Sequence, residues 1–313
     1  MRRFVALART AAMESLAEPL TAVLFLSGLG MVHLAPVFHY HQFGEAGRLA
    51  RECGFSVLLV FGLVIATAAA VRTLARELES GTAAATLALS VPRAMFFTAK
   101  VAGVLAAFLL FAVAVMAATA LSRSSSMVAS ILQVEHGDAS QAWGPALAAG
   151  VGFTLGAFAF AAAANRFLRM RFCMSACFLM VFAQLAALGV AMVLGRGLPP
   201  EFPGFAAVLC AMLPAFTVLF AGCSVFVVFA GVLATRLKFA TCTALTAAAV
   251  VTSFVFPLKF VLPDINAFWL VDRLAGGAGL GWGEVVPQLA AALALAGFWL
   301  IVGSVLLERR EIP

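Results

Sequence analysis

Long apolar runs are the feature that most constrains how this chain folds. Eight of them occur along its 313 residues, at 19–38, 55–75, 95–121, 143–164, 172–194, 205–233, 239–260 and 285–306. An α-helix needs roughly 20 apolar residues to cross a bilayer, and each run is close to that length or longer. Backbone polar groups inside hydrocarbon must be satisfied within their own segment, so each run is predicted to be a helix. The sequence therefore predicts an all-α, polytopic transmembrane helical bundle of about eight spans, with 1–313 as a single domain.

Composition excludes an ordinary water-soluble fold. Hydrophobic residues make up 64% of the chain and charged residues 11%, whereas soluble domains carry about 25% charged residues. Residues 1–18 are predicted to form an interfacial N-terminal helix before an uncleaved first span, because Glu14 and Glu18 interrupt what would be the apolar part of a secretion signal. The run 205–233 contains Pro214 and is compatible with one kinked helix or with a re-entrant piece followed by a span.

Basic residues give the predicted orientation. With both termini in the cytoplasm, fourteen of the 20 Lys and Arg residues fall in cytoplasmic segments, as the positive-inside rule requires. The other six fall in predicted exterior segments, one of which is 122–141, and are Arg48, Arg51, Arg123, Arg196, Lys259 and Arg273. The net charge of +6 is explained by this asymmetry. No loop combines a basic patch with interleaved aromatic residues, so nucleic acid is not an expected partner.

Motifs for covalent chemistry do not occur. The sequence lacks the G-x-x-x-x-G-K-[ST] phosphate loop, the H-E-x-x-H zinc motif and the G-x-S-x-G nucleophile elbow. Its six cysteines include no C-x-x-C pair and are interpreted as packing residues. We therefore expect no catalytic residue and no cofactor bound by this chain.

Polar residues inside the predicted spans are few. His33 and Gln184 are the candidate polar groups of a transport pathway, although the favoured interpretation of Gln184 is that it holds helices together. His39 and His41 are weak candidates for metal ligands, and the alternative is that they are interfacial polar residues. Carriers that use ion gradients generally need ionisable groups near the midplane of the membrane. The small number of such groups in the predicted spans therefore favours an external energy source.

Residues 76–94, RELESGTAAATLALSVPRA, interrupt the apolar pattern between the second and third runs. Gly81 is a predicted break after the second span. Thr82 to Leu89 is predicted to form a short amphipathic helix lying crosswise at the cytoplasmic surface. Ser90 is a possible cap of the next helix, with Pro92 in its first turn. A solvated connector is the alternative interpretation.

This segment resembles the cytoplasmic loop of type-2 ATP-binding-cassette (ABC) exporter permeases. The resemblance consists of an acidic pair, Gly-Thr, a Leu-rich turn, Pro, a basic residue and a later Lys. These are here Glu77, Glu79, Gly81, Thr82, Leu87, Leu89, Pro92, Arg93 and Lys100. The resemblance implies that 76–94 is a coupling loop whose residues Glu77 to Arg93 contact a separate ATPase subunit.

Both ends of the chain resemble the same family. The start has an interfacial helix with a Glu, a Pro and then the first span, and the last external segment and the ending ERRE also match. The family core has six spans, so the eight runs imply an extra pair within 172–260.

The resemblance implies a membrane-spanning permease subunit of an ABC exporter in the bacterial cytoplasmic (inner) membrane. ATP and Mg would bind the partner ATPase, and the permease would pair with a second copy or with a paralogous permease. The alternatives are a gradient-driven secondary transporter or channel, and a membrane-embedded enzyme or assembly factor that uses His39 and His41.

Overall fold

The computed structural model describes residues 1–41, 45, 47–83, 87, 91–136, 140–194, 202–256, 262–277 and 280–310. Within these ranges the chain forms helices and short connections, with no β-strand. The elements are α1 (Arg2–Ala17), α2 (Pro19–Leu34), η1 (Ala35–His41), α3 (Arg48–Glu79), α5 (Arg93–His136), α6 (Ser140–Leu168), α7 (Phe172–Leu194), α8 (Phe205–Ala234), α9 (Phe239–Val255), α10 (Ile265–Phe268), η3 (Val271–Gly277) and α11 (Trp282–Glu308).

Seven of the described helices are long and apolar enough to cross a membrane, so the chain is a multi-pass membrane protein. These segments are Pro19–Phe38, Arg48–Glu79, Arg93–Val128, Gly150–Leu168, Phe172–Val193, Phe205–Ala234 and Trp282–Glu308. The predicted run 239–260 forms only α9, a helix of 17 residues. The all-helical bundle is confirmed, and an eighth span remains a prediction.

α8 decides between the two interpretations of 205–233. It is one continuous helix of 30 residues with Pro214 inside it. A re-entrant piece followed by a separate span is therefore wrong. Proline removes one backbone donor from a helix interior, and α8 nevertheless continues through the buried Pro214.

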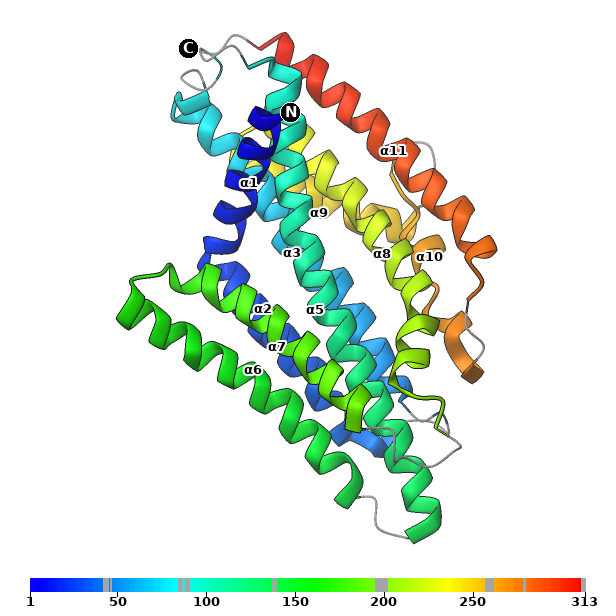
Figure 1. Cartoon of the computed structure of the whole chain (residues 1–313). Helices are drawn as coiled ribbons and strands as arrows, with labels where there is room; N and C mark the ends of the chain where they lie inside the picture. The colour runs from blue at the N-terminus through cyan, green and yellow to red at the C-terminus, as the bar shows by residue number, and fades with distance from the viewer. Residues whose placement is uncertain are drawn as a thin grey trace.

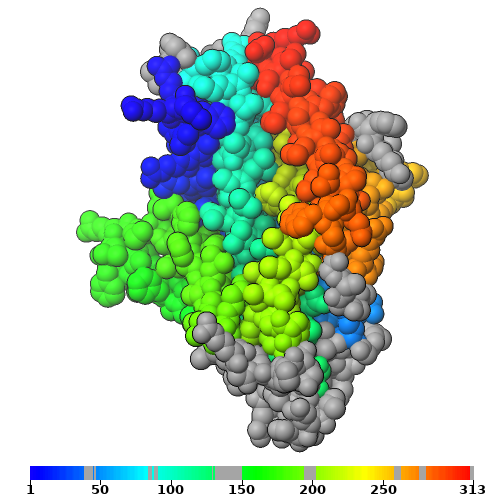
Figure 2. Space-filling view, turned by 45° about the vertical axis from the view of Figure 1, so that its right-hand side comes forward, coloured from blue at the N-terminus to red at the C-terminus, as the bar shows by residue number. Residues whose placement is uncertain are grey.

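The bundle has a central group of helices and a peripheral group (Figure 1). Over the 18 most apolar consecutive residues of each helix, 67% of the stretch is buried in α3 and in α8, and 61% in α5. In α6 and α11 the buried share of this stretch is 22% and 11%. In Figure 2, α11 (orange to red) lies along one side of the molecular surface, and α6 and α7 (green) project from the other.

Both chain termini lie at the same end of the bundle (Figure 1). We call this end the terminal face, and it includes the end of α3 and the start of α5. We call the opposite end the distal face, which includes η1, the start of α3 and η3.

Glycines allow the central helices to approach closely. A Cβ on Gly54 of α3 would lie 2.5 Å from Cγ2 of Thr119 on α5. A Cβ on Gly62 would lie 2.6 Å from Cε2 of Phe108. Small residues at helix contacts are a general means of packing helices in membranes, where no hydrophobic force brings them together.

α5 is longer than the sequence predicts. The apolar run ends at residue 121, but the helix continues to His136, through the segment Ser122–Ser126 expected outside the membrane. The backbone remains helical there because these side chains are buried against the bundle, and the hydroxyls of Ser125 and Ser126 bond carbonyls one turn back. Hydropathy alone therefore mistook a polar, buried helix for a loop.

The connection between α3 and α5 begins later than predicted. Arg76 to Glu79 form the last turn of α3, so the predicted loop 76–94 starts inside a helix. Gly81 has φ +73° and confirms the predicted break, because glycine adopts this left-handed conformation without strain. The carbonyl of Pro92 accepts the bond from Phe96 N, so Pro92 stands immediately before α5. Residues 84–86 and 88–90, which hold most of the predicted crosswise helix and Ser90, lie outside the described residues.

Candidate functional site

A polar cleft opens at the terminal face between α1, the start of α2 and the end of α3. Its volume is about 520 Å³. The lining is unusually polar for this chain and consists of Glu14, Ser15, Ala17, Glu18, Pro19, Ala69, Arg72, Thr73, Arg76, Glu77, Ser80, Thr82 and Arg171. Carboxylates and guanidinium groups are mixed in it, which suits a partner that presents both signs of charge.

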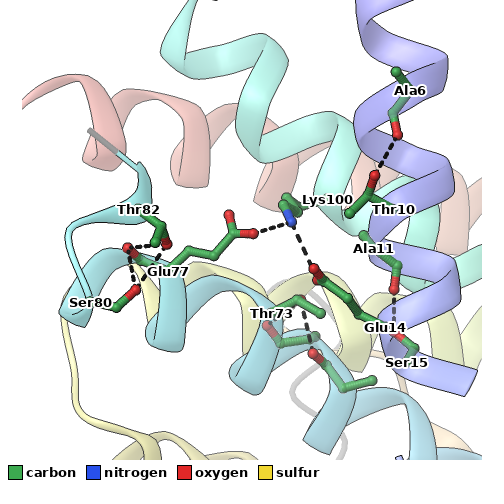
Figure 3. Close-up of polar contacts among 12 residues, drawn as sticks. Ala6, Thr10, Ala11, Glu14, Ser15, Thr73, Glu77, Ser80, Thr82 and Lys100 are labelled. Atoms are coloured by element: carbon green, nitrogen blue, oxygen red, sulfur yellow. Dashed lines mark hydrogen bonds and ion pairs between the residues drawn. The ribbon is translucent and has the colours of Figure 1, made fainter. Parts of the chain in front are cut away.

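Lys100 is the centre of the ion-pair network beside this cleft (Figure 3). Its side chain, on α5, is 2% exposed, and its Nζ lies 2.5 Å from Oε1 of Glu77 and 3.5 Å from Oε2 of Glu14. One ammonium thus joins α5 to the last turn of α3 and to α1. A buried ion is tolerated only when it is paired, so the two carboxylates explain how Lys100 is buried.

A second ion pair lies in the lining of the cleft. Arg72 Nη1 donates to Oε2 of Glu18 at 2.8 Å. Glu18 separates α1 from α2 in an extended conformation, and Pro19 opens α2 at the position where a missing N–H has no consequence. The break between the two N-terminal helices is therefore fixed to α3.

Arg93 lies beside the end of α11. Its Nη1 donates to the carbonyl oxygens of Glu308 at 2.7 Å and of Arg310 at 2.8 Å. A cation at a helix C-terminus satisfies carbonyls that have no partner within the helix. The start of α5 is thus joined to the end of the last helix.

The predicted ATPase-contacting residues separate into two groups. Glu77 and Arg93 are engaged within the chain, as described above. Glu79 and Thr82 are exposed, and the Thr82 hydroxyl lies 2.9 Å from that of Ser80.

The other four predicted ATPase-contacting residues differ in their exposure. Gly81 and Leu87 are half-buried, and Pro92 is exposed. Leu89 lies outside the described residues. The surface available to a partner is consequently the stretch that includes Glu79, Ser80 and Thr82.

The two predicted pathway residues lie together in the bundle. His33 Nε2 lies 2.9 Å from Oε1 of Gln184, and Gln184 Nε2 donates to Oγ1 of Thr154 at 2.8 Å. A Cβ on Gly150 would lie 2.6 Å from Cε1 of His33, so this glycine makes room for the ring. The network links α2, α6 and α7, which agrees with the interpretation that Gln184 holds helices together.

The side chains of His39 and His41 lie outside the described residues, so their candidacy as metal ligands stays a prediction. In the part of the chain that the structure describes, no group of three His, Cys, Asp or Glu residues is placed to hold a metal ion.

The sequence interpretation missed three buried cations. The partners of Lys100 are 23 and 86 positions away in the chain, so no local pattern reveals them. Arg51 and Arg123 were expected outside the membrane as ordinary exterior charges, yet they are 1% and 6% exposed. The only signal for Arg123 was its position among four serines, a run that reads equally well as a loop.

Comparisons with known proteins add no family assignment. No family model matches this chain, no curated protein is significantly similar to it, and no solved structure matches it.

Proposed function

We propose that this chain is the membrane-spanning permease subunit of an ABC exporter in the bacterial inner membrane. In this role a separate ATPase subunit binds the terminal face, which lies in the cytoplasm, and hydrolyses ATP. The permease pairs with a second copy or a paralogue, and movement of the pair carries the substrate outward. The sequence resemblance in 76–94 is the origin of the proposal.

The linkage at Lys100 is the observation that supports the proposal best. A push on the connection after α3 acts on Glu77, and the ion pairs at Lys100 pass the displacement to α5 and to α1. Arg93 passes it to the end of α11. Because one short segment is attached to four helices, a soluble motor that grips it can tilt several spans together.

Glu79 provides the sharpest test of this proposal. It is exposed on the segment expected to meet the ATPase, and it takes no part in the Lys100 network. In Glu79→Arg we expect binding of the ATPase to fall by on the order of tenfold, because a rim charge of the wrong sign opposes docking. The measurement is co-purification of an ATPase with a phosphate-loop motif from native membranes, with its nucleotide hydrolysis.

Glu284→Arg is the matched control. Glu284 is also an exposed carboxylate, with 59% of its side chain accessible, but it lies near the distal face. Equal yield of both variants in the membrane fraction shows that insertion is intact. Undiminished co-purification and hydrolysis with Glu79→Arg would contradict the proposal.

A gradient-driven carrier is the second candidate, and the buried His33 favours it. An ionisable ring that contacts polar side chains within the bundle is what proton-coupled carriers use. Such a carrier moves substrate in vesicles that contain this chain alone and no nucleotide. Transport under those conditions would support the second candidate against the first.

A further inference from the structure

Two buried arginines lie at the distal face, at the ends of two neighbouring spans. Arg51 is in the first turn of α3 and is 1% exposed, and Arg123 is on α5 and is 6% exposed. Thr119 of α5 packs on Gly54 of α3. Arg123 is one turn beyond Thr119 and Arg51 is one turn before Gly54, so the two arginines face the same junction between the helices.

Arg51 has partners of its own. Its Nη1 donates to Oε1 of Glu45 and, at 3.1 Å, to the carbonyl oxygen of Leu274, and its Nη2 donates to Oε2 of Glu45 at 3.3 Å. This fork on one carboxylate is the geometry that arginine prefers. Glu45 is therefore already committed to Arg51.

Arg123 lies beneath the backbone at Gly47 and has no such partner. Gly47 has φ +75°, and a Cβ there would lie 2.7 Å from Cγ of Arg123 and 2.9 Å from its carbonyl oxygen. In the described part of the chain no carboxylate lies within ion-pair distance of Arg123. Its Nε is buried without a hydrogen-bond partner, as is the Nε of Arg51.

The carboxylate that acts on Arg123 is the one already bound to Arg51. Arg123 is repelled by Arg51 and attracted by the single carboxylate of Glu45. Arg48, at the same end of α3, is paired with Glu52 at 2.7 Å, and Asp272 acts on Arg48. Among the described residues, the guanidinium groups of Arg51 and Arg123 thus have one carboxylate between them, since Glu52 and Asp272 act on Arg48. A buried ion in this condition is costly to the fold unless an anion joins it.

We propose that Arg123 and Arg51 form a binding site for a phosphate group at the distal end of the α3–α5 junction. A phosphodiester gives Arg123 an anionic partner that the described residues do not supply, and the planar guanidinium donors match phosphate oxygens. Arg51 lies in the first turn of α3, a helix of 32 residues that is longer than the hydrocarbon core, and Arg123 lies beside this turn, so both are at the depth of lipid headgroups. The phosphate comes from a lipid headgroup or from free phosphate in solution. The proposal does not depend on transport, because binding is a property of the isolated chain.

The test measures thermal stability of the purified full-length chain. One arm compares nanodiscs of phosphatidylcholine alone with nanodiscs that also contain phosphatidylglycerol. The other arm titrates inorganic phosphate. A ligand that binds the native state raises the melting temperature in a saturable way. A shift with phosphatidylglycerol alone assigns the site to an anionic lipid headgroup, whose phosphodiester is not paired with a choline cation. A shift in both arms assigns it to phosphate in general.

Variants decide whether the arginines are responsible. We expect Arg123→Gln to weaken the apparent affinity by about tenfold or more, because a hydrogen bond to a charged group contributes a free energy of that size. Arg123→Lys should retain part of the affinity, because it keeps the positive charge. Glu45→Gln frees Arg51 and should strengthen binding. Arg273→Gln is the control, because Arg273 is an exposed arginine of the same face, with 61% of its side chain accessible.

Three outcomes overturn the proposal: no saturable shift in the wild type, an unchanged affinity in Arg123→Gln, or an equal loss in Arg273→Gln. If Arg123→Gln does not fold, the Glu45→Gln variant still tests the proposal, because weaker or unchanged phosphate binding in that variant contradicts it. ATPase binding plays no part in either arm, so failure here is distinguishable from failure of the proposed function.

Discussion

Individual residues of this chain show where a membrane protein tolerates buried charge. Lys100 is buried because two carboxylates from other helices meet it, and Arg51 because Glu45 and the carbonyl of Leu274 do. Oε2 of Glu77 remains buried with no partner. The Glu77 carboxylate is thus only partly satisfied within the described chain.

Replacing Lys100 tests the ion-pair network at the scale of one residue. Lys100→Met keeps the approximate volume but leaves Glu77 and Glu14 without their cation. We expect the free energy of unfolding to fall by roughly 1–3 kcal/mol, less than for a fully buried pair because both carboxylates are partly exposed. Thermal unfolding in detergent is the measurement.

Lys238→Met is the control for this change, because Lys238 is exposed at the same face. The double variant Lys100→Met with Glu77→Gln should recover part of the loss, since it removes the stranded carboxylate. Equal stability of Lys100→Met and the wild type would show that the network contributes nothing to the fold.

At the scale of elements, the N-terminal helix is held on α5 by close backbone contact. A Cβ on Gly103 would lie 2.7 Å from Cβ of Ala11, and the carbonyl oxygen of Ala8 lies closer still. A backbone atom cannot rotate away as a flexible side chain does. α1 therefore has a fixed distance from α5, which in turn places Glu14 beside Lys100.

Gly103→Ala should displace α1 from α5. We expect a loss of about 1–3 kcal/mol in unfolding free energy, typical of overpacking, and faster proteolysis within 1–18. Gly152→Ala is the control, because a Cβ there meets nothing within 4 Å. If both glycine variants unfold at the wild-type temperature, the close contact between α1 and α5 is not what holds the helix.

The whole molecule has a polar terminal face around the cleft and a broad apolar surface along its sides. Exposed apolar side chains gather on the peripheral helices, for example Leu293 and Ile301 on α11, at 71% and 67% exposure. Such a surface requires lipid or another transmembrane helix beside it. The termini share the terminal face, so the orientation of the whole chain follows from the side on which that face lies.

Labelling from one side of the membrane tests this orientation. In a cysteine-free background, we expect a membrane-impermeant maleimide to label Arg273→Cys in intact cells. It should label Ser80→Cys only after the membrane is opened, because the positive-inside rule places the terminal face in the cytoplasm. The reverse pattern would overturn the orientation and remove the basis for an ATPase at that face.

The sequence by itself determined the helical, membrane-embedded character of the chain. Hydropathy reports the cost of burying polar backbone in lipid, so it located helices at all eight runs, and the start of α8 at Phe205 was predicted to the residue. Gly81 was identified because its left-handed backbone is a local preference of one residue type. Helix location and the break at Gly81 depend on residues that are close together in the sequence, which is why the sequence alone predicts them.

Only the tertiary structure decided which polar residues meet. His33 and Gln184 are 151 positions apart and contact each other because α2 and α7 pack side by side. Glu77 was expected to face a partner, and the fold turned it to Lys100. The serines around Arg123 were interpreted as a loop, and packing against α3 kept them helical and buried. Contacts between distant segments depend on how helices pack, and hydropathy contains no information about that.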